Sequence, residues 1–401
     1  MKALFNSLGS NYDYQFVFKA LFAGNLSRHK EALTGLLSEK YKGEAHLFYK
    51  GREAIQAALV LAALPENSPV MITGYTCYAV YKAVADAGCV PVFVDIESGE
   101  LNFNATTLKA AHKLHPDAKA VIVQNTLGFA SDIEGIQGFA KKEGLIVIED
   151  LAHCIGLEYE NEVEAGMVGD FVTLSFSQDK VVDGISGGAL VVRNSRYKNK
   201  AQQMLKYSRL GFRQQLRDRI YPLLTVSIRF LYPVKLGKLK HEIAKRLHLL
   251  AKPVDGVFGK YRTLPSWYCK LILDQFKTLP ALERRRRAIA EIYAREISEK
   301  HQVMSKYSTP TYLRFPVLVK NRQALFNYLK QQQIYITDIW YETPIAPARY
   351  LSKTSYQKGS CPQSEELAAT MINLPTHQAV RLKDAQIIAR KVEVWLSQVE
   401  K

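Results

Sequence analysis

Short apolar runs alternate with helical patterns between residues 44 and 195, and this alternation is the strongest constraint on the fold. The apolar runs predict strands at residues 69–73, 90–95, 120–124, 145–150 and 189–193. Between them, apolar side chains recur at helical spacing in residues 54–64, 78–87, 105–115 and 133–143. Strands this apolar are buried on both faces, so the pattern predicts an α/β fold with a mainly parallel sheet flanked by helices. Ligands of such sheets bind at the carboxyl ends of the strands, where Asp150 and Asn125 lie.

An acidic strand end and a later lysine predict the chemistry of the site. A carboxylate such as that of Asp150 suits the ring nitrogen of pyridoxal phosphate, because it keeps the ring protonated and able to accept electrons. Lys180 follows on a serine-rich loop and can hold the cofactor covalently through its amine. The hydroxyls of Ser175 and Ser177 are close enough in sequence to reach the cofactor phosphate. Each residue alone is common elsewhere, but their order and spacing predict a pyridoxal phosphate site.

Length and composition set the class and the expected location. With 401 residues, the chain can form two or three domains, or one large and one small domain. Its five cysteines show no paired close spacing, so neither a disulfide framework nor a metal site is expected. We find no signal-peptide h-region and no apolar run long enough for a transmembrane helix, which favours the cytoplasm.

We expect three parts along the chain. Residues 1–205 are predicted to form a large cofactor-binding domain with an N-terminal arm, residues 206–262 a basic and apolar helical insertion, and residues 263–401 a small α+β domain with a linking helix. The formal net charge is +16, and no nucleic-acid-binding module accompanies it, so nucleic acid is not an expected partner.

The insertion holds much of the positive charge. Between Lys206 and Lys252 it has twelve Lys or Arg against two acids, Asp218 and Glu242, beside an apolar run at residues 220–232. One interpretation is a solvated helical insertion packed on its own enzyme. The alternatives are a cationic amphipathic element on anionic lipid at the inner face of the membrane, or a contact with a protein partner.

Beyond these residues, nearly the whole chain resembles the DegT/StrS family of pyridoxal-phosphate sugar aminotransferases, which have the aspartate-aminotransferase fold (fold type I). The segments that match follow the family's order, at residues 48–55, 71–77, 88–95, 124–128, 148–153, 175–188, 340–347 and 373–377. The resemblance implies that the first of these is a glycine-containing helix start that cradles the cofactor phosphate.

The resemblance also implies roles for single residues. Asp150 would pair with the ring nitrogen, His153 would hydrogen-bond near the cofactor's phenolic oxygen, and Ser175 would hold phosphate. Lys180 would bind the cofactor covalently and then move a proton as the general base. Asn125 is a candidate contact for the ring or the cofactor oxygen, with a plain turn residue as the alternative. The alternative for His153 is a satisfied core histidine.

Three positions depart from the family pattern. Arg52 and Glu53 replace the small hydroxyl residue after the phosphate-loop glycine, Gly51, so backbone N–H groups and the Arg52 guanidinium would hold the phosphate. The aromatic residue that commonly stacks on the cofactor falls at Cys77, which leaves a neighbouring tyrosine or the thiol itself to cover the ring. The segment that reaches across the family's dimer is not recognisable, and residues 259–262 are a poor substitute.

The resemblance implies a homodimeric aminotransferase that moves an amino group, from glutamate, onto a nucleotide-linked keto sugar in amino-sugar or polysaccharide synthesis. A dehydratase is disfavoured, because the related dehydratases carry a histidine where this chain has Lys180. Two alternatives stay open: a pyridoxal phosphate enzyme for a non-sugar keto substrate, and a catalytically silent regulatory or membrane-associated scaffold of the same fold. The presence of both Asp150 and Lys180 argues against the scaffold.

Overall fold

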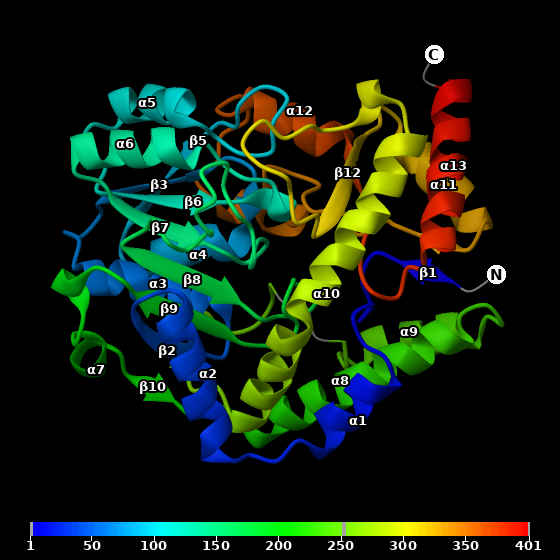
Figure 1. Ribbon diagram of the computed structural model, residues 1–401, viewed down its shortest axis with the longest axis horizontal. Helices are drawn as coiled ribbons and strands as arrows, with labels where there is room; N and C mark the ends of the chain where they lie inside the picture. Colours follow the sequence, from blue (N-terminus) through cyan, green and yellow to red (C-terminus); the bar gives the residue numbers. More distant parts are fainter. Residues whose placement is uncertain (1–2, 251–253, 400–401) are drawn as a thin grey trace.

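A seven-stranded sheet forms the centre of the large domain in the computed structural model, which describes residues 3–250 and 254–399 (Figure 1). In spatial order the strands are β2 (Glu44–Phe48), β9 (Gly188–Val192), β8 (Phe171–Ser175), β7 (Ile146–Asp150), β6 (Ala120–Gln124), β3 (Pro69–Thr73) and β5 (Val90–Val94). The neighbours from β8 to β5 run parallel, whereas β9 is antiparallel to both β8 and β2. The predicted mainly parallel α/β sheet is therefore confirmed.

Successive residues of the strands point to opposite faces of the sheet, and each face has its own buried cluster. In β6, Val121 and Val123 join one cluster, while Ala120 and Ile122 join the other. The helices that flank the sheet are α2 (Ser27–Lys40), α3 (Gly51–Ala62), α4 (Tyr78–Asp86), α5 (Ala105–Leu114), α6 (Ile133–Glu143) and the long α10 (Ser266–Glu296). Helices α2, α5, α6 and the first half of α10 cover one face, and α3 and α4 cover the other.

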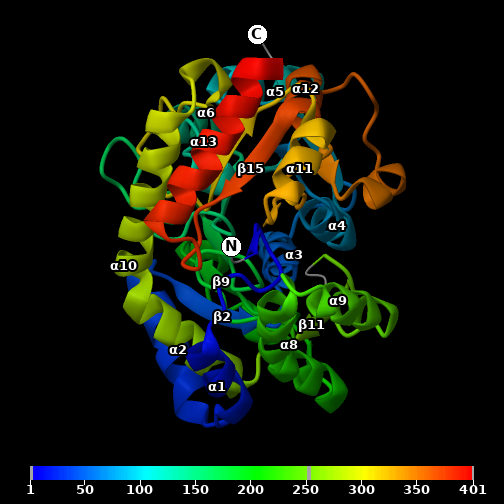
Figure 2. The same ribbon diagram turned by 90° about the vertical axis from the view of Figure 1, so that its right-hand side faces the viewer.

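A smaller α+β unit follows α10. Its centre is the antiparallel pair of β12 (Arg314–Leu318) and β15 (Met371–Pro375), packed with the end of α10, α11 (Arg322–Gln331) and α13 (Leu382–Val399). The N-terminal arm joins this unit, because β1 (Leu4–Phe5) pairs in parallel with β13 (Ile334–Tyr335). Figure 2 shows β15, α11 and α13 side by side near the C-terminus.

Several short elements connect the two units. Strand β4 (Thr76–Cys77) pairs in parallel with β14 (Ile345–Ala346), which brings the segment at residues 340–347 against the large domain. The remaining short elements are η1 (Thr126–Gly128), η2 (Ser195–Tyr197), α7 (Ala201–Met204), η3 (Glu299–His301), η4 (Ala348–Lys353) and α12 (Pro362–Thr370).

The basic insertion forms two helices, α8 (Phe212–Leu231) and α9 (Leu236–Arg246), which pack on each other, and α8 also packs on α1 (Tyr14–Phe22) of the arm. Strands β10 (Tyr207–Ser208) and β11 (Tyr261–Arg262) pair in parallel at its two ends. The division at residues 1–205, 206–262 and 263–401 stays a prediction. Lys252, which ends the basic stretch, lies outside the described residues, as do residues 1, 2, 251, 253, 400 and 401. Within residues 3–250 and 254–399, no helix has both the length and the apolar character needed to cross a membrane.

The close approach of β9 to the start of α3 generates a stability prediction. A Cβ atom on Gly188 would lie 2.5 Å from the backbone nitrogen of Gly51 and 2.5 Å from the carbonyl carbon of Lys50. Because backbone atoms cannot move aside cheaply, Gly188→Ala should lower the free energy of unfolding by about 1–3 kcal/mol. Urea unfolding of the variant measures this loss.

The matched control is Gly138→Ala in α6, where an added Cβ would meet nothing within 4 Å. That variant should gain about 0.5–1 kcal/mol, because alanine is the better helix former. Equal stability of the two variants would contradict the close approach.

Candidate functional site

Asp150 and Lys180 meet at the carboxyl edge of the sheet. Asp150 is the last residue of β7, and Lys180 lies on the loop that follows β8. Cys77, which precedes α4, joins them, because the charges of Cys77 and Asp150 both act on the Lys180 amine. The structure therefore brings together one carboxylate, one amine and one thiol that the sequence predicted for the site.

Burial shapes the ionisation of this group. Asp150 is 4% exposed, and burial raises the pKa of its carboxyl, against the Ala152 N–H, 3.0 Å from Oδ1, and the Lys180 amine, which lower it. Burial lowers the pKa of Lys180 to about 8, with Cys77 and Asp150 opposing the shift. An amine with this pKa is partly neutral near physiological pH and can act as a nucleophile and a base.

The loop that carries Lys180 is held by Asp183. The Asp183 carboxylate accepts hydrogen bonds from the backbone N–H groups of Asp179 (2.8 Å) and Ile185 (2.9 Å). Two residues of the N-terminal arm complete the set: Asn11 donates through Nδ2 at 3.1 Å, and the Tyr12 hydroxyl donates at 2.8 Å. Four donors on one buried carboxylate fix the loop, and with it the position of the Lys180 amine.

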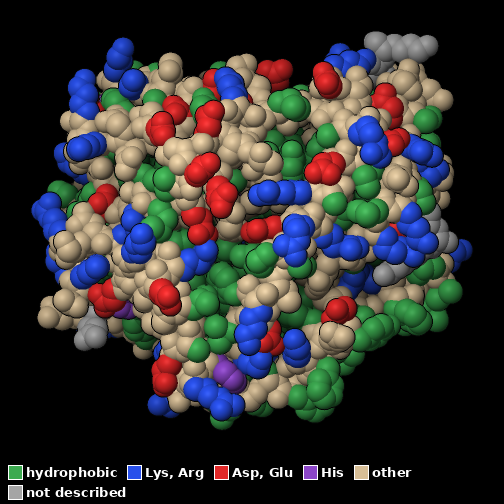
Figure 3. Space-filling model, viewed as in Figure 1, with side chains coloured by type: hydrophobic (Ala, Val, Ile, Leu, Met, Phe, Trp, Pro, Cys, Tyr) green, Lys and Arg blue, Asp and Glu red, His purple; other side chains and the backbone are tan. Residues whose placement is uncertain are grey.

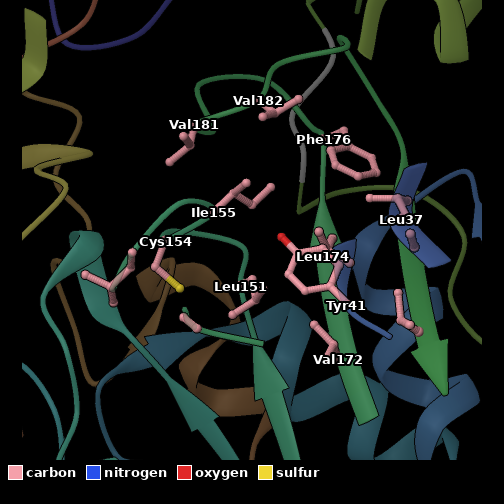
Figure 4. Close-up of a cluster of buried hydrophobic side chains, with 14 of the residues drawn as sticks. Leu37, Tyr41, Leu151, Cys154, Ile155, Val172, Leu174, Phe176, Val181 and Val182 are labelled. Carbon is pink, nitrogen blue, oxygen red and sulfur yellow. The ribbon is translucent and has the colours of Figure 1, made fainter. Parts of the chain in front are cut away.

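Apolar packing also holds the loop that carries Lys180. Val181 and Val182, which follow Lys180 in the chain, belong to the buried cluster that includes Ile155 and Phe176 (Figure 4). The loop is thus fixed by packing next to Lys180 as well as by Asp183.

The start of α3 faces a serine hydroxyl. Among the described residues, no side-chain hydrogen bond caps the start of α3. A Cβ on Gly51 would lie 3.0 Å from Ser175 Oγ, which shows how closely the helix start approaches this hydroxyl. Ser177 is also buried, and its backbone carbonyl accepts a hydrogen bond from the backbone N–H of Lys180 at 3.3 Å. A helix N-terminus beside a hydroxyl is an arrangement that suits a phosphate group.

His153 is buried and neutral. Its Nδ1 accepts the Leu127 N–H at 3.2 Å, which places the ring proton on Nε2, 3.3 Å from the Tyr341 hydroxyl. Burial, followed by the charges of Lys180 and Arg314, holds the pKa of His153 well below its usual range. Its ring also stacks on Trp340, with centroids 5.1 Å apart and planes inclined by 17°.

Trp340 is a site residue for which no role was predicted from the sequence. The Lys180 Nζ lies 4.4 Å from the centre of its ring, and the Arg314 guanidinium lies 4.1 Å from it. Arg314 is in turn fixed by Asp338, through a 3.0 Å ion pair. The sequence signal that could have indicated this role was the aromatic pair Trp340 and Tyr341, in the segment at residues 340–347 that matches the family. Only the pairing of β4 with β14 shows that this segment lies beside Cys77.

The structure directs three of the predicted side chains elsewhere. The Arg52 guanidinium donates to the carbonyls of Val254 (2.9 Å) and Asp255 (3.1 Å) and covers the Phe258 ring at 3.8 Å. Its expected contact with a phosphate is replaced by these carbonyls. Glu53 pairs with Arg262 at 2.6 Å. Both side chains therefore attach the C-terminal end of the insertion to α3.

Asn125 is likewise engaged away from Lys180. Its Nδ2 donates to the Tyr159 hydroxyl at 2.9 Å, and its Oδ1 accepts the Ser131 N–H at 2.8 Å. The side chain is fully buried with both polar atoms satisfied, as the alternative of a structural turn residue predicts. In the part of the chain that the structure describes, no group of three or more His, Cys, Asp or Glu side chains could hold a metal ion.

A carboxylate and a buried amine at the carboxyl edge of a mainly parallel sheet define the fold-type I class of pyridoxal phosphate enzymes. Within this class, the chain belongs to the DegT/DnrJ/EryC1/StrS aminotransferase family, whose sequence pattern matches residues 40–393. The family expectation from the sequence is therefore confirmed.

Individual relatives are distant but nearly full length. The chain is 24% identical to the pleiotropic regulatory protein of Geobacillus stearothermophilus, over 85% of this chain and 82% of that protein. It is also 24% identical to the GDP-perosamine synthase of Escherichia coli O157:H7, over 89% of this chain and 88% of that enzyme. The crystal structure of S. venezuelae DesV superimposes with a TM-score of 0.74 at 19% identity, covering 96% of this chain and 94% of DesV, which shows a shared fold.

The donor set fits the cofactor of this family. Asp150 supplies a carboxylate for a ring nitrogen, and Lys180 supplies a partly neutral amine for an aldehyde. The N-terminus of α3, which approaches Ser175 Oγ closely at Gly51, suits a phosphate. These three features lie at one edge of the sheet, as a single bound molecule requires.

The lowered pKa of Lys180 generates a test on the cofactor-free protein. Acylation requires the neutral amine, so its pH profile should have a midpoint near the pKa of about 8. An ordinary lysine has a pKa of about 10.4, so Lys180 should react about two hundredfold faster than such a lysine at pH 7 for equal intrinsic reactivity. Competitive labelling with mass spectrometry measures the profile residue by residue.

Asp150→Asn should move the midpoint further down, because the Asp150 carboxylate raises the pKa of Lys180. Exposed Lys113 serves as the internal control in the same sample. A Lys180 midpoint near that of Lys113 would contradict the buried amine.

Proposed function

We propose that the protein is a pyridoxal-phosphate-dependent aminotransferase that moves an amino group from glutamate to a keto sugar carried on a nucleotide. The observation that carries the proposal is the Lys180 amine beside the Asp150 carboxylate, in a chain of an aminotransferase family. When bound, the cofactor supplies an electron sink that stabilises negative charge on the carbon bearing the amine.

Each of the binding residues has a proposed task. Asp150 holds the protonated ring nitrogen, and Lys180 holds the cofactor covalently until an amino substrate displaces it. The N–H groups at Gly51 and Arg52, together with the hydroxyls of Ser175 and Ser177, hold the phosphate. The Arg52 guanidinium and the Glu53 carboxylate support this helix start from outside, through the insertion.

Lys180 also moves the proton in this proposal. The pKa of its amine in the structure is about 8, and in this proposal the amine takes a proton from one carbon and returns it to another near neutral pH. The ring of Trp340, 4.4 Å from the amine, covers it and limits the approach of water. His153 fixes Tyr341 through Nε2, and the Tyr341 backbone is held by the Tyr75 hydroxyl at 2.8 Å.

The nature of the substrate is supported by relatives. A chain similar over 88% of its length is a GDP-perosamine synthase, an enzyme named for a sugar joined to a nucleotide. Glutamate is the donor that the family resemblance implies. We also propose a cytoplasmic location, which suits the five free cysteines of the described chain.

Replacing the lysine tests the chemistry. The purified protein should bind pyridoxal phosphate with visible absorption, and Lys180→Ala should lose the borohydride-stable attachment, because the described site offers no second amine beside Asp150. Lys113→Ala, at an exposed position on α5, is the matched control and should keep it. A Lys180→Ala protein that still forms the adduct at the wild-type level would refute the assignment.

A substrate screen completes this test. Keto-sugar nucleotides are offered one at a time with ¹⁵N-labelled glutamate, and transfer of the label to the sugar is followed by mass spectrometry. Labelling of a sugar by the wild type and not by Lys180→Ala is the expected result. If the protein binds the cofactor and transfers the label to keto acids but to none of the sugars, a non-sugar substrate is favoured.

We propose a homodimer, as the family resemblance implies. Sedimentation at assay concentration should give about twice the 45.3 kDa of the single chain. A fully active species of single-chain mass would contradict this proposal.

A further inference from the structure

Three neighbouring helices each expose a stripe of large apolar side chains. In each helix the exposed residues are spaced three, four or seven positions apart, so they lie on one face. The stripes consist of Tyr14, Phe18 and Phe22 on α1; Phe212, Leu216, Ile220, Leu223 and Phe230 on α8; and Leu236, Leu239, Ile243 and Leu247 on α9 and its C-cap. Each of these side chains is between 42% and 76% exposed. We call this set the apolar face.

The apolar face is separate from the side of α8 that packs on the protein. Tyr221 and Ile228 lie on the opposite side of α8 and are buried. Helix α8 is thus apolar on two sides, and only one of them serves the core. Of the apolar run at residues 220–232, one part packs on the enzyme and another part is left exposed.

The three stripes lie at one end of the molecule. Helix α8 packs on both α1 and α9, and in Figures 1 and 2 the three helices form the end away from the C-terminus. In Figure 3, hydrophobic side chains gather along the lower right edge, over α1 and α9. Exposed apolar surface of this extent is unusual for a protein that meets only water.

Cations border the apolar face. The exposed basic residues of the three helices and of the turn before α9 are Lys19, Arg213, Lys235, Lys238, Lys245 and Arg246. The acids within the three helices are Asp218, which is buried, and Glu242. Two further arginines turn inward: Arg219 donates to the Ala20 carbonyl at 3.0 Å, and Arg229 donates to the Tyr12 carbonyl at 2.6 Å. Both arginines attach the arm to α8. Among the bordering cations, Lys19 pairs with Asp274 at 3.2 Å and Arg246 pairs with Glu242 at 3.3 Å.

We propose that the apolar face docks on an anionic lipid bilayer, with α1, α8 and α9 lying in the plane of the interface. Amphipathic helices with aromatic and leucine side chains on one face and basic residues beside it bind bilayers in this way. Each cation near an anionic leaflet adds to the attraction. The N-terminal arm contributes three aromatic residues to the face, outside the insertion itself.

A second copy of the chain is a poorer occupant of the same face. In a two-fold dimer the same patch meets itself, so the bordering cations of one copy would meet those of the other. Like charges brought together in this way oppose association. Anionic lipid is complementary to the same border, and this charge argument selects the bilayer. The proposal does not depend on the substrate or on the reaction.

Vesicle flotation with the full-length holoenzyme tests the proposal. The probes are vesicles of phosphatidylcholine alone and vesicles of phosphatidylcholine with phosphatidylglycerol. The wild type should float with the anionic vesicles at low salt, remain in the soluble fraction with the neutral vesicles, and dissociate as salt shortens the Debye length from about 10 Å at 0.1 M. A wild type that stays in the soluble fraction with anionic vesicles at low salt overturns the proposal.

Two variants separate the apolar and electrostatic contributions. Leu239→Ser with Ile243→Ser removes apolar side chains of α9, and Arg213→Glu with Lys245→Glu reverses two bordering cations. Each should lower the affinity for anionic vesicles about tenfold or more. Lys113→Glu with Leu114→Ser makes both kinds of change at the exposed end of α5 and should float like the wild type.

Sedimentation and cofactor absorption are measured on the same samples. Unchanged absorption and unchanged mass, with lost flotation, support a lipid-docking face. If the apolar variant instead halves the mass while the wild type never floats, the face is an interface between copies and the proposal is wrong. Equal flotation of the α5 control and the two face variants also overturns it.

Discussion

The buried carboxylate of Asp183 is the interaction on which the active arrangement depends. Burial raises its pKa to about 6, and four donors lower the cost of keeping it charged. Two donors come from its own loop and two from the N-terminal arm, so the carboxylate ties Lys180 to a segment about 170 residues away in the sequence. Loop, arm and small domain are therefore positioned by one another.

The sequence predicted what depends on local pattern. The alternation of apolar strands and amphipathic helices placed the sheet correctly, because burial on both faces leaves a clear signal in each strand. It also placed Asp150 at a strand end beside Lys180, since the carboxyl ends of parallel strands meet at one edge. A helical insertion at residues 206–262 was expected, but the participation of α1 in the same surface was not.

What the sequence could not supply depends on contacts between distant segments. Trp340 reaches Lys180 only because β14 pairs with β4, a pairing of two residues that leaves no periodic signal. Arg52 was expected on a phosphate, and the structure gives its guanidinium to backbone carbonyls of the insertion. Every residue has a backbone carbonyl, so the residue types in a loop do not show that its carbonyls will accept hydrogen bonds from Arg52.

The N-terminal arm makes two kinds of contact within four residues, from Asn11 to Tyr14. Asn11 and Tyr12 donate to Asp183, while Tyr14 begins the exposed stripe of α1. Because a helix is stiff along its axis, a displacement of α1 would be transmitted through Asn11 and Tyr12 to the loop that carries Lys180. Lifting the arm away would strip Asp183 of two of its four donors and slacken the loop that presents the amine. The N-terminal arm therefore joins the apolar face to the hydrogen bonds that hold the loop of the reactive lysine.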